Sequence, residues 1–186
     1  MQMGAGSRLQ CRLLTETDRG SAYDLLAMPP TLNLLPDTTE PIMTQAKYAA
    51  FAALDPFFDV VMQGLADAVD GNHYFEAIAD DAVFEYRYVF PGFPTKVVGR
   101  DALMALYSGY GDSTILHSGD ALVVHRSQDP RVIILEYEVH GKKISTGKSY
   151  DNRFISVVTI EGRKIVHWRD YMDSLAAFTA AAGTGA

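Results

Sequence analysis

KIVHWRDYMD, residues 164–173, is the stretch that decides the fold. Apolar and polar residues alternate along most of it, which is typical of a strand with one buried face and predicts a strand over residues 164–172. Successive side chains of a strand point to opposite faces, so one face carries Val166, Trp168, Asp170 and Met172. A single carboxylate among apolar neighbours is a candidate for acid or base chemistry, because burial opposes its ionisation.

Working outward from this strand, alternation predicts four more strands, bounded by turn-forming residues. They cover residues 83–90, 121–126, 132–140 and 149–160. Turns at residues 128–130, 141–143 and 161–162 separate the last three of these strands from one another and from the strand at residues 164–172. The second half of the chain is therefore predicted to be an antiparallel meander.

Helical signals lie upstream of the meander. Asp55 followed by Pro56 predicts the start of an amphipathic helix that ends near Gly71, and residues 72–79 predict a short second helix before a polar turn at residues 80–81. A third helix begins at Asp101, and Leu103, Leu106, Tyr107 and Tyr110 share one of its faces. The alanine-rich segment 175–182 predicts a last helical turn.

Helices followed by a run of strands predict an α+β fold, with a curved antiparallel or mixed sheet whose helices cover a pocket. Residues 1–42 show no sustained periodicity and are predicted to be an irregular extension. Residues 43–180 form the predicted domain, and residues 181–186 form a tail. We expect a chain that starts at Met43 to fold with nearly the same stability.

Composition narrows the range of partners. The net charge of −7 and the isoelectric point near 5.1 oppose binding to phosphate backbones and anionic lipid surfaces. We therefore expect no nucleic-acid or membrane partner. Cys11 is the single cysteine, and no export signal is recognisable, so a cytoplasmic location is expected.

Four segments, residues 75–83, 99–103, 146–150 and 162–173, resemble the SnoaL-like families of the nuclear transport factor two-like superfamily. The last two segments are similar to those of limonene-1,2-epoxide hydrolases, and also to those of polyketide cyclases and ketosteroid isomerase relatives. The resemblance implies a cone-shaped fold with a cystatin-like roll, no metal and no organic cofactor, and a homodimer. Chemistry transfers less well than fold.

The site residues of the epoxide hydrolases transfer only in part. The aspartate of their WRDYFD motif falls on Asp170. Their arginine and first aspartate fall on Tyr137 and Val139, and their tyrosine and asparagine fall on Phe84 and Tyr86. Four of the five roles are therefore missing, which disfavours epoxide hydrolysis.

Inward-facing residues give the predicted site. Asp170 is the expected proton-transfer group, and Tyr86 and Tyr137 complete the catalytic set, with Asn152 as a further candidate to hold a substrate oxygen. The expected substrate-binding residues are Trp168, Asn152, Phe154, Phe84, Tyr88 and Met172. The alternative is that the aromatic residues only fill the core. A small, apolar or weakly polar molecule is the expected ligand.

Two classes of function remain open at this point. The first is a cofactor-free isomerase, cyclase or hydrolase, and the second is a non-catalytic binding or dimerisation module. His140 and His167 are expected to face outward, and no metal site is expected. An apolar stripe of Ile134, Ile155, Val157 and Thr159 on the outer sheet face predicts a two-fold homodimer.

Overall fold

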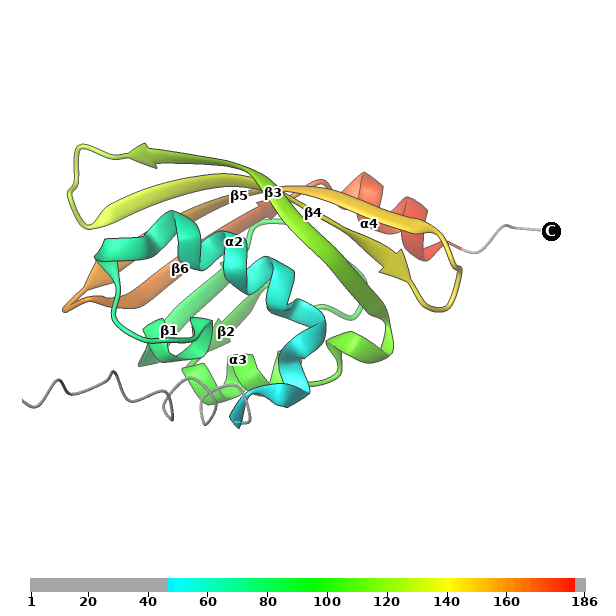
Figure 1. Cartoon of the computed structure of the whole chain (residues 1–186), viewed down its shortest axis with the longest axis horizontal. Helices are drawn as coiled ribbons and strands as arrows, with labels where there is room; N and C mark the ends of the chain where they lie inside the picture. The colour runs from blue at the N-terminus through cyan, green and yellow to red at the C-terminus, as the bar shows by residue number, and fades with distance from the viewer. Residues whose placement is uncertain (1–46, 183–186) are drawn as a thin grey trace, which may run out of the picture. The chain divides into compact units, whose positions relative to one another are not determined.

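The computed structural model describes residues 47–182, which belong to one structural unit (Figure 1). The predicted extension, residues 1–42, and most of the predicted tail, residues 183–186, lie outside the described residues. The domain bounds and the dispensability of the extension therefore stay predictions.

A curved sheet of six strands forms one layer (Figure 1). Along the chain the strands are β1 (Ile78–Tyr86), β2 (Lys96–Val98), β3 (Thr114–Arg126), β4 (Val132–Lys143), β5 (Ser149–Glu161) and β6 (Lys164–Met172). Their spatial order is β2-β1-β6-β5-β4-β3. β1 runs parallel to β6, and all other neighbours are antiparallel. The predicted α+β class and mixed sheet are confirmed.

Helices form the second layer. They are η1 (Ala49–Leu54), α2 (Asp55–Leu65), η2 (Ala66–Ala68), η3 (Tyr74–Ala77), α3 (Arg100–Tyr107), η4 (Tyr110–Asp112) and α4 (Ser174–Ala181). Helix α2 packs across β3 and β4, α3 packs against β1, and α4 packs against β5. Figure 1 shows α2 and α3 on the same side of the sheet.

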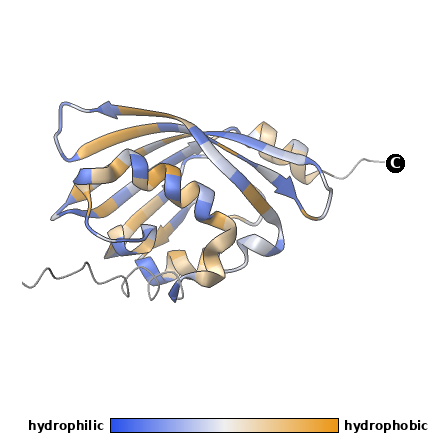
Figure 2. Ribbon diagram, in the orientation of Figure 1, coloured by the Kyte–Doolittle hydropathy of each residue, from blue (hydrophilic) through white to orange (hydrophobic). Residues whose placement is uncertain are grey.

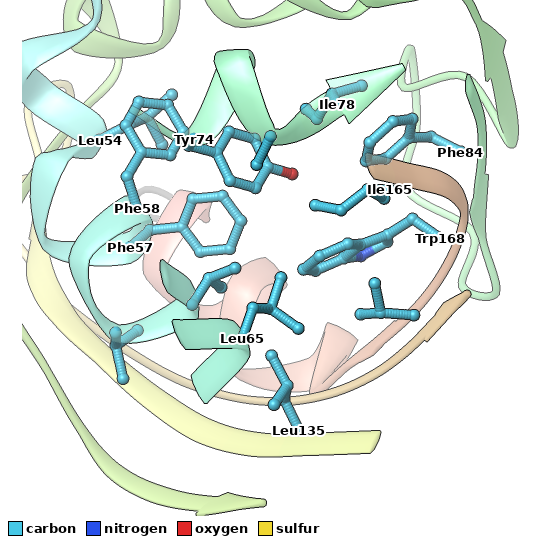
Figure 3. Packing of buried hydrophobic residues seen from close by; sticks show 14 of the residues in the cluster. Leu54, Phe57, Phe58, Leu65, Tyr74, Ile78, Phe84, Leu135, Ile165 and Trp168 are labelled. Atoms are coloured by element: carbon cyan, nitrogen blue, oxygen red, sulfur yellow. The ribbon is translucent and has the colours of Figure 1, made fainter. Parts of the chain in front are cut away.

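The core lies between α2, η3 and the inner face of the sheet (Figure 3). Phe58 stacks on Tyr74 with ring centroids 4.7 Å apart, and Phe84 stacks on Trp168 at 5.9 Å. Figure 2 shows apolar and polar stretches along the strands of the sheet. Strand alternation brings Phe84 and Trp168 to the inner face of the sheet, where Phe58 and Tyr74 of the helical layer cover it.

The helical run Ala49–Ala68 is 20 residues long and has a hydropathy of 1.3, so length and composition alone would allow it to span a membrane. In this fold its apolar side chains cover the sheet, and Phe58, Val61 and Leu65 are buried there. Its composition is explained by packing in the core.

Helix boundaries differ from the prediction at three places. α2 ends at Leu65 rather than near Gly71, because Ala66 adopts a φ of 21° that interrupts the helix. The second helix is only the single 3-10 turn of η3, capped by His73, whose Nδ1 accepts from the Phe75 N–H at 3.2 Å. The third begins one residue early, at Arg100, and ends at Tyr107.

Strand boundaries differ as well. β1 begins at Ile78 and includes the predicted polar turn at residues 80–81, because a register shift against β6 lets these exposed residues continue the strand. It ends at Tyr86 instead of residue 90, which leaves Tyr88 and Phe90 in a loop. The three-residue strand β2 was not predicted.

The hairpin of β3 and β4 is longer than predicted at both ends. β3 begins at Thr114 rather than residue 121, and β4 continues through the predicted turn at residues 141–143. Gly141 makes this possible, because a Cβ there would collide with the Ile115 carbonyl of the neighbouring strand. The extension carries Lys143 to the end of β4.

Candidate functional site

A cavity of about 240 Å³ opens beside the core, on the inner side of the sheet. Its wall is mainly aromatic and aliphatic, with a few polar groups. The lining residues are Leu54, Phe57, Tyr88, Phe90, Phe93, Leu106, Tyr107, Tyr110, Ser113, Leu116, Val139, Lys143, Tyr150, Phe154, Asp170, Met172 and Ala177.

Asp170 is the one carboxyl in this lining, and its side chain is placed by β6 next to β5. The residue is only 6% exposed. Ser156 Oγ donates to Asp170 Oδ1 at 2.6 Å, and the Trp168 indole N–H donates to the same oxygen at 3.3 Å. Burial raises the pKa of Asp170 to about 7, although these two hydrogen bonds oppose the rise.

Tyr137 supports Asp170 indirectly. Its hydroxyl lies 3.0 Å from Ser156 Oγ, and Ser156 uses its own proton on Asp170, so the tyrosine donates to the serine. The Tyr137 ring is 2% exposed and stacks on Phe154 with centroids 5.3 Å apart. The structure therefore places Tyr137 behind the cavity wall, where it orients Ser156 rather than touching a ligand.

Tyr86 also acts through a neighbour. It pairs in register with Asp170 across β1 and β6, so both side chains face the same side of the sheet. The Tyr86 hydroxyl donates to the Tyr107 hydroxyl at 3.2 Å, and Tyr107 on α3 lines the cavity. Because Tyr107 accepts this bond, its own proton is free to point towards a ligand.

The predicted substrate-binding residues fall into two groups. Tyr88, Phe154 and Met172 line the cavity. Phe84, Trp168 and Asn152 do not, since each is no more than 2% exposed and packed elsewhere. For Phe84 and Trp168 the reason is that α2 and η3 cover their part of the inner sheet face, and strand alternation carries no information about which part is covered.

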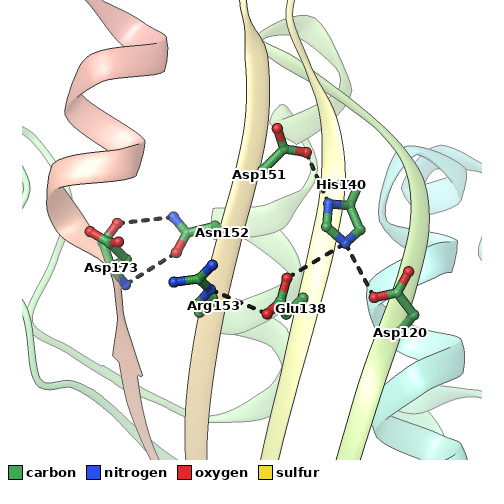
Figure 4. Close-up of polar contacts among 7 residues, drawn as sticks. All are labelled: Asp120, Glu138, His140, Asp151, Asn152, Arg153 and Asp173. Carbon is green, nitrogen blue, oxygen red and sulfur yellow. Dashed lines mark hydrogen bonds and ion pairs between the residues drawn. The ribbon is translucent and has the colours of Figure 1, made fainter.

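Asn152 has a structural role. Its Oδ1 accepts from the Asp173 backbone N–H at 3.1 Å, and its Nδ2 donates to the Asp173 carbonyl at 3.1 Å (Figure 4). Asp173 in turn caps α4, because its Oδ1 accepts from the Ala176 N–H at 3.0 Å. Asn152 thus holds the start of α4 against β5.

Sequence reasoning missed the cavity residues Lys143 and Tyr107 as site residues. Tyr107 was assigned to a helix face shared with Leu106 and Tyr110, and that shared face was the available signal. Lys143 was assigned to a turn. No local pattern distinguishes a turn from a strand that continues past a glycine, so nothing in the sequence marked it.

The outer face of the sheet holds a separate group of charged residues (Figure 4). His140 lies between three carboxylates: its Nδ1 is 2.9 Å from Asp151, and its Nε2 is 3.2 Å from Asp120 and 3.8 Å from Glu138. Asp120, Glu138 and His140 offer ligand atoms within 4.8 Å of one another, as a metal site would require. Glu138 is also bound by Arg153 at 3.2 Å, so the group forms an ion-pair network.

Known proteins are similar to this chain in sequence and in fold. Over 106 residues the chain is 33% identical to the uncharacterized protein YesE of Bacillus subtilis (strain 168), a match covering 57% of this chain and 72% of YesE. The crystal structure of a proposed isomerase from Bacillus subtilis superposes with a TM-score of 0.57 at 26% identity, covering 75% of this chain and 94% of that one.

A phenazine biosynthesis-related protein from Pseudomonas aeruginosa shares the fold, with a TM-score of 0.53 at 18% identity over 78% of this chain and 85% of that one. Residues 49–168 match the family model of the SnoaL-like domain. This match spans most of the described fold, including η1 to β5 and the first half of β6. The chain therefore belongs to the SnoaL-like domain family.

Proposed function

We propose that the protein is a cofactor-independent enzyme of the isomerase or cyclase type, which moves a proton at a carbon next to a carbonyl group. The observation that supports this most directly is a carboxyl group in a cavity wall with its pKa raised to about 7. A proton-transfer group works best when its pKa lies near the working pH. Membership of the SnoaL-like family and the similarity to a proposed isomerase favour the same class.

The proposed step begins with Asp170 as a carboxylate. Its Oδ2 takes a proton from the carbon beside the carbonyl, and the electron pair of the broken C–H bond moves to the carbonyl oxygen as an enolate. The Tyr107 hydroxyl donates a hydrogen bond to that oxygen. Where the substrate carries a C=C bond conjugated with the enolate, Asp170 returns the proton to the far carbon of that bond and the double bond shifts, which is an isomerisation. Alternatively, the enolate carbon attacks a second carbonyl of the same molecule and closes a ring, and the alkoxide formed there takes the proton from Asp170.

Tyr107 takes the role that the sequence assigned to Tyr86 and Tyr137. Both of those side chains hydrogen-bond to protein hydroxyls, Tyr86 to Tyr107 and Tyr137 to Ser156. Tyr86 thus positions Tyr107, which lines the cavity, and Tyr137 positions Ser156, which in turn holds the cavity residue Asp170. In this proposal Tyr86 orients the oxygen-binding hydroxyl and Tyr137 orients the acid.

The test is solvent deuterium exchange into 2-tetralone, a bicyclic ketone with an acidic C–H next to its carbonyl, followed by NMR in D₂O. Asp170→Asn keeps the shape and removes the base, so we expect exchange by the protein to fall about 100-fold or more. Binding of 2-tetralone, measured by calorimetry, should change little. Asp81→Asn, an exposed aspartate on β1, is the matched control.

Two results would contradict the proposal. If Asp170→Asn exchanges as fast as the wild type, Asp170 is not the base. If 2-tetralone binds to both forms and neither promotes exchange, the cavity serves as a binding module without chemistry.

The pH profile provides an independent check. Because the base is the ionised form of Asp170, the exchange rate should rise with pH and level off above about 7, where the carboxyl is ionised. A rate that is flat between pH 5 and pH 8 would assign the chemistry to another group.

A further inference from the structure

Lys143 places a cation in the cavity wall. It is the last residue of β4, and its Nζ donates to Thr114 Oγ1 at 2.6 Å on the neighbouring strand β3. The same nitrogen lies 5.0 Å from the ring centroid of Tyr150, which also lines the cavity. The half-buried side chain is thus held in position from two strands.

The charge of Lys143 is not balanced nearby. Within residues 47–182 no carboxylate lies within salt-bridge distance of it. Asp170, the one carboxyl of the cavity lining, makes its hydrogen bonds with Ser156 and Trp168 instead. Burial lowers the pKa of Lys143, which is the expected response of a cation that has lost water without gaining a counter-ion.

The ammonium group keeps unused hydrogen-bond donors. It has three N–H donors, and within the described residues Thr114 receives the one side-chain bond that it makes. Tyr150 offers another donor beside it. The Tyr150 hydroxyl accepts from Asn152 Nδ2 at 3.4 Å, so its own proton remains available. Donors without acceptors therefore gather at this end of the cavity.

We propose that Lys143 binds an anionic oxygen, a carboxylate or enolate, of a ligand whose apolar body lies in the aromatic cavity. The free N–H donors of a cation bind most strongly to an acceptor that carries negative charge, because hydrogen bonds between charged groups are stronger than those between neutral groups. The inference rests on the proposed function only in using the same cavity, and it names the substrate class as small organic acids or acidic enols.

The net charge of −7 acts against an anionic ligand at long range. That repulsion is spread over the surface and falls off within a Debye length of about 8 Å at physiological salt. A contact with Lys143 acts at hydrogen-bond distance and in a partly dry site, where electrostatic interactions are stronger. We therefore expect Lys143, rather than the net charge of the protein, to determine whether the cavity prefers an anionic or a neutral ligand.

The experiment compares two probes of similar shape, 2-naphthoate, which carries a carboxylate, and 2-acetylnaphthalene, which is neutral. Calorimetry on the wild type at pH 7 should give at least about tenfold tighter binding of 2-naphthoate, the scale of one charge-assisted hydrogen bond. Lys143→Met should remove this preference and leave 2-acetylnaphthalene within about twofold of its wild-type affinity. Lys143→Arg should retain the preference, and Lys142→Met, an exposed neighbour, is the control.

Equal affinity of the two probes for the wild type would overturn the inference, and this comparison needs no variant to fold. So would a Lys143→Met protein, folded by circular dichroism, that still prefers 2-naphthoate, or a wild type that binds neither probe. Failure of the proposed function looks different. If Asp170→Asn leaves 2-tetralone exchange unchanged while the preference for 2-naphthoate depends on Lys143, the catalytic proposal falls and the anion site stands.

Discussion

The Asp170 carboxyl couples the proposed chemistry to the stability of the fold. Its pKa is about 7 in the folded protein, against 3.8 for an ordinary aspartate, so the folded state binds this proton more tightly than the unfolded state does. The contribution to the free energy of unfolding is therefore fully present below about pH 4 and is lost as the pH rises through 7. At about 1.4 kcal/mol per pKa unit, the loss is at most about 4 kcal/mol.

Asp170→Asn tests this coupling, because asparagine can accept the same two hydrogen bonds without acquiring a charge. Between pH 5 and pH 8 we expect the melting temperature of the wild type to fall more than that of the variant. The variant should therefore be the more stable protein at pH 8. Thermal unfolding followed by circular dichroism measures the effect, with Asp81→Asn as reference. If the melting temperatures of wild type and Asp170→Asn change with pH in parallel, ionisation of Asp170 does not lower the stability of the fold.

At the same scale, the sequence predicted that Asp170 lies in the wall of the cavity, and it misplaced other residues. Asp170 could be found because it interrupts an apolar strand face, and such a group has few uses other than hydrogen bonding or proton transfer. Phe84 and Trp168 share that face and yet lie in the core. What separates them from Phe154 is the position of α2 and η3 over the sheet, which depends on packing between segments far apart in the chain.

Elements could be predicted where alternation is strong and the flanking turns are clear. β5 and β6 match the prediction to within one residue, and the Gly162 and Arg163 turn between them has positive φ angles of 54° and 61°, as a tight hairpin requires. β3 was only half predicted. Its first residues lack alternation because Gly119 and its neighbours meet α2, and Ala121 forms an irregular step with a φ of 52°.

Gly119 controls how closely α2 approaches β3. A Cβ at this position would overlap the Pro56 carbonyl oxygen and lie 2.9 Å from Val60 Cγ1. Gly119→Ala should therefore lower the free energy of unfolding by about 1 to 3 kcal/mol, because helix and strand must move apart. Urea unfolding checks this against Gly109→Ala, where the atom nearest to the added Cβ is Asp112 Oδ2, 3.8 Å away. Equal stability of the two variants would mean that α2 and β3 can move apart without loss of stability.

At the scale of the whole molecule, the outer face of the sheet exposes apolar side chains that a second protein could cover. Ile155 and Tyr171 are paired in register there and are 45% and 40% exposed, and Val123 on β3 is 47% exposed. The ion-pair network around His140 lies on the same face of β3, β4 and β5. An apolar patch with a charged margin is the composition of a protein interface, and we expect a two-fold homodimer through it.

Val157→Glu tests the dimer, since Val157 lies on this face between Ile134 and Arg169. In a two-fold interface each introduced carboxylate meets its own copy or enters an apolar contact, so the variant should be monomeric at concentrations where the wild type is a dimer. Light scattering after size-exclusion chromatography gives the mass. Val98→Glu, on the edge strand β2 and already 56% exposed, is the control. Equal masses for wild type and Val157→Glu would place any interface elsewhere.

The hydrogen bonds around Asp170 also have a stereochemical consequence. Ser156 and Trp168 both donate to Oδ1, and within the described residues no hydrogen bond reaches Oδ2. One oxygen on one wall would then both remove and return the proton, so transfer should occur across a single face of a flat substrate. When the proton held by Asp170 exchanges with D₂O before it is returned, a chiral product should carry its deuterium on that face alone, as one enantiomer rather than a racemate.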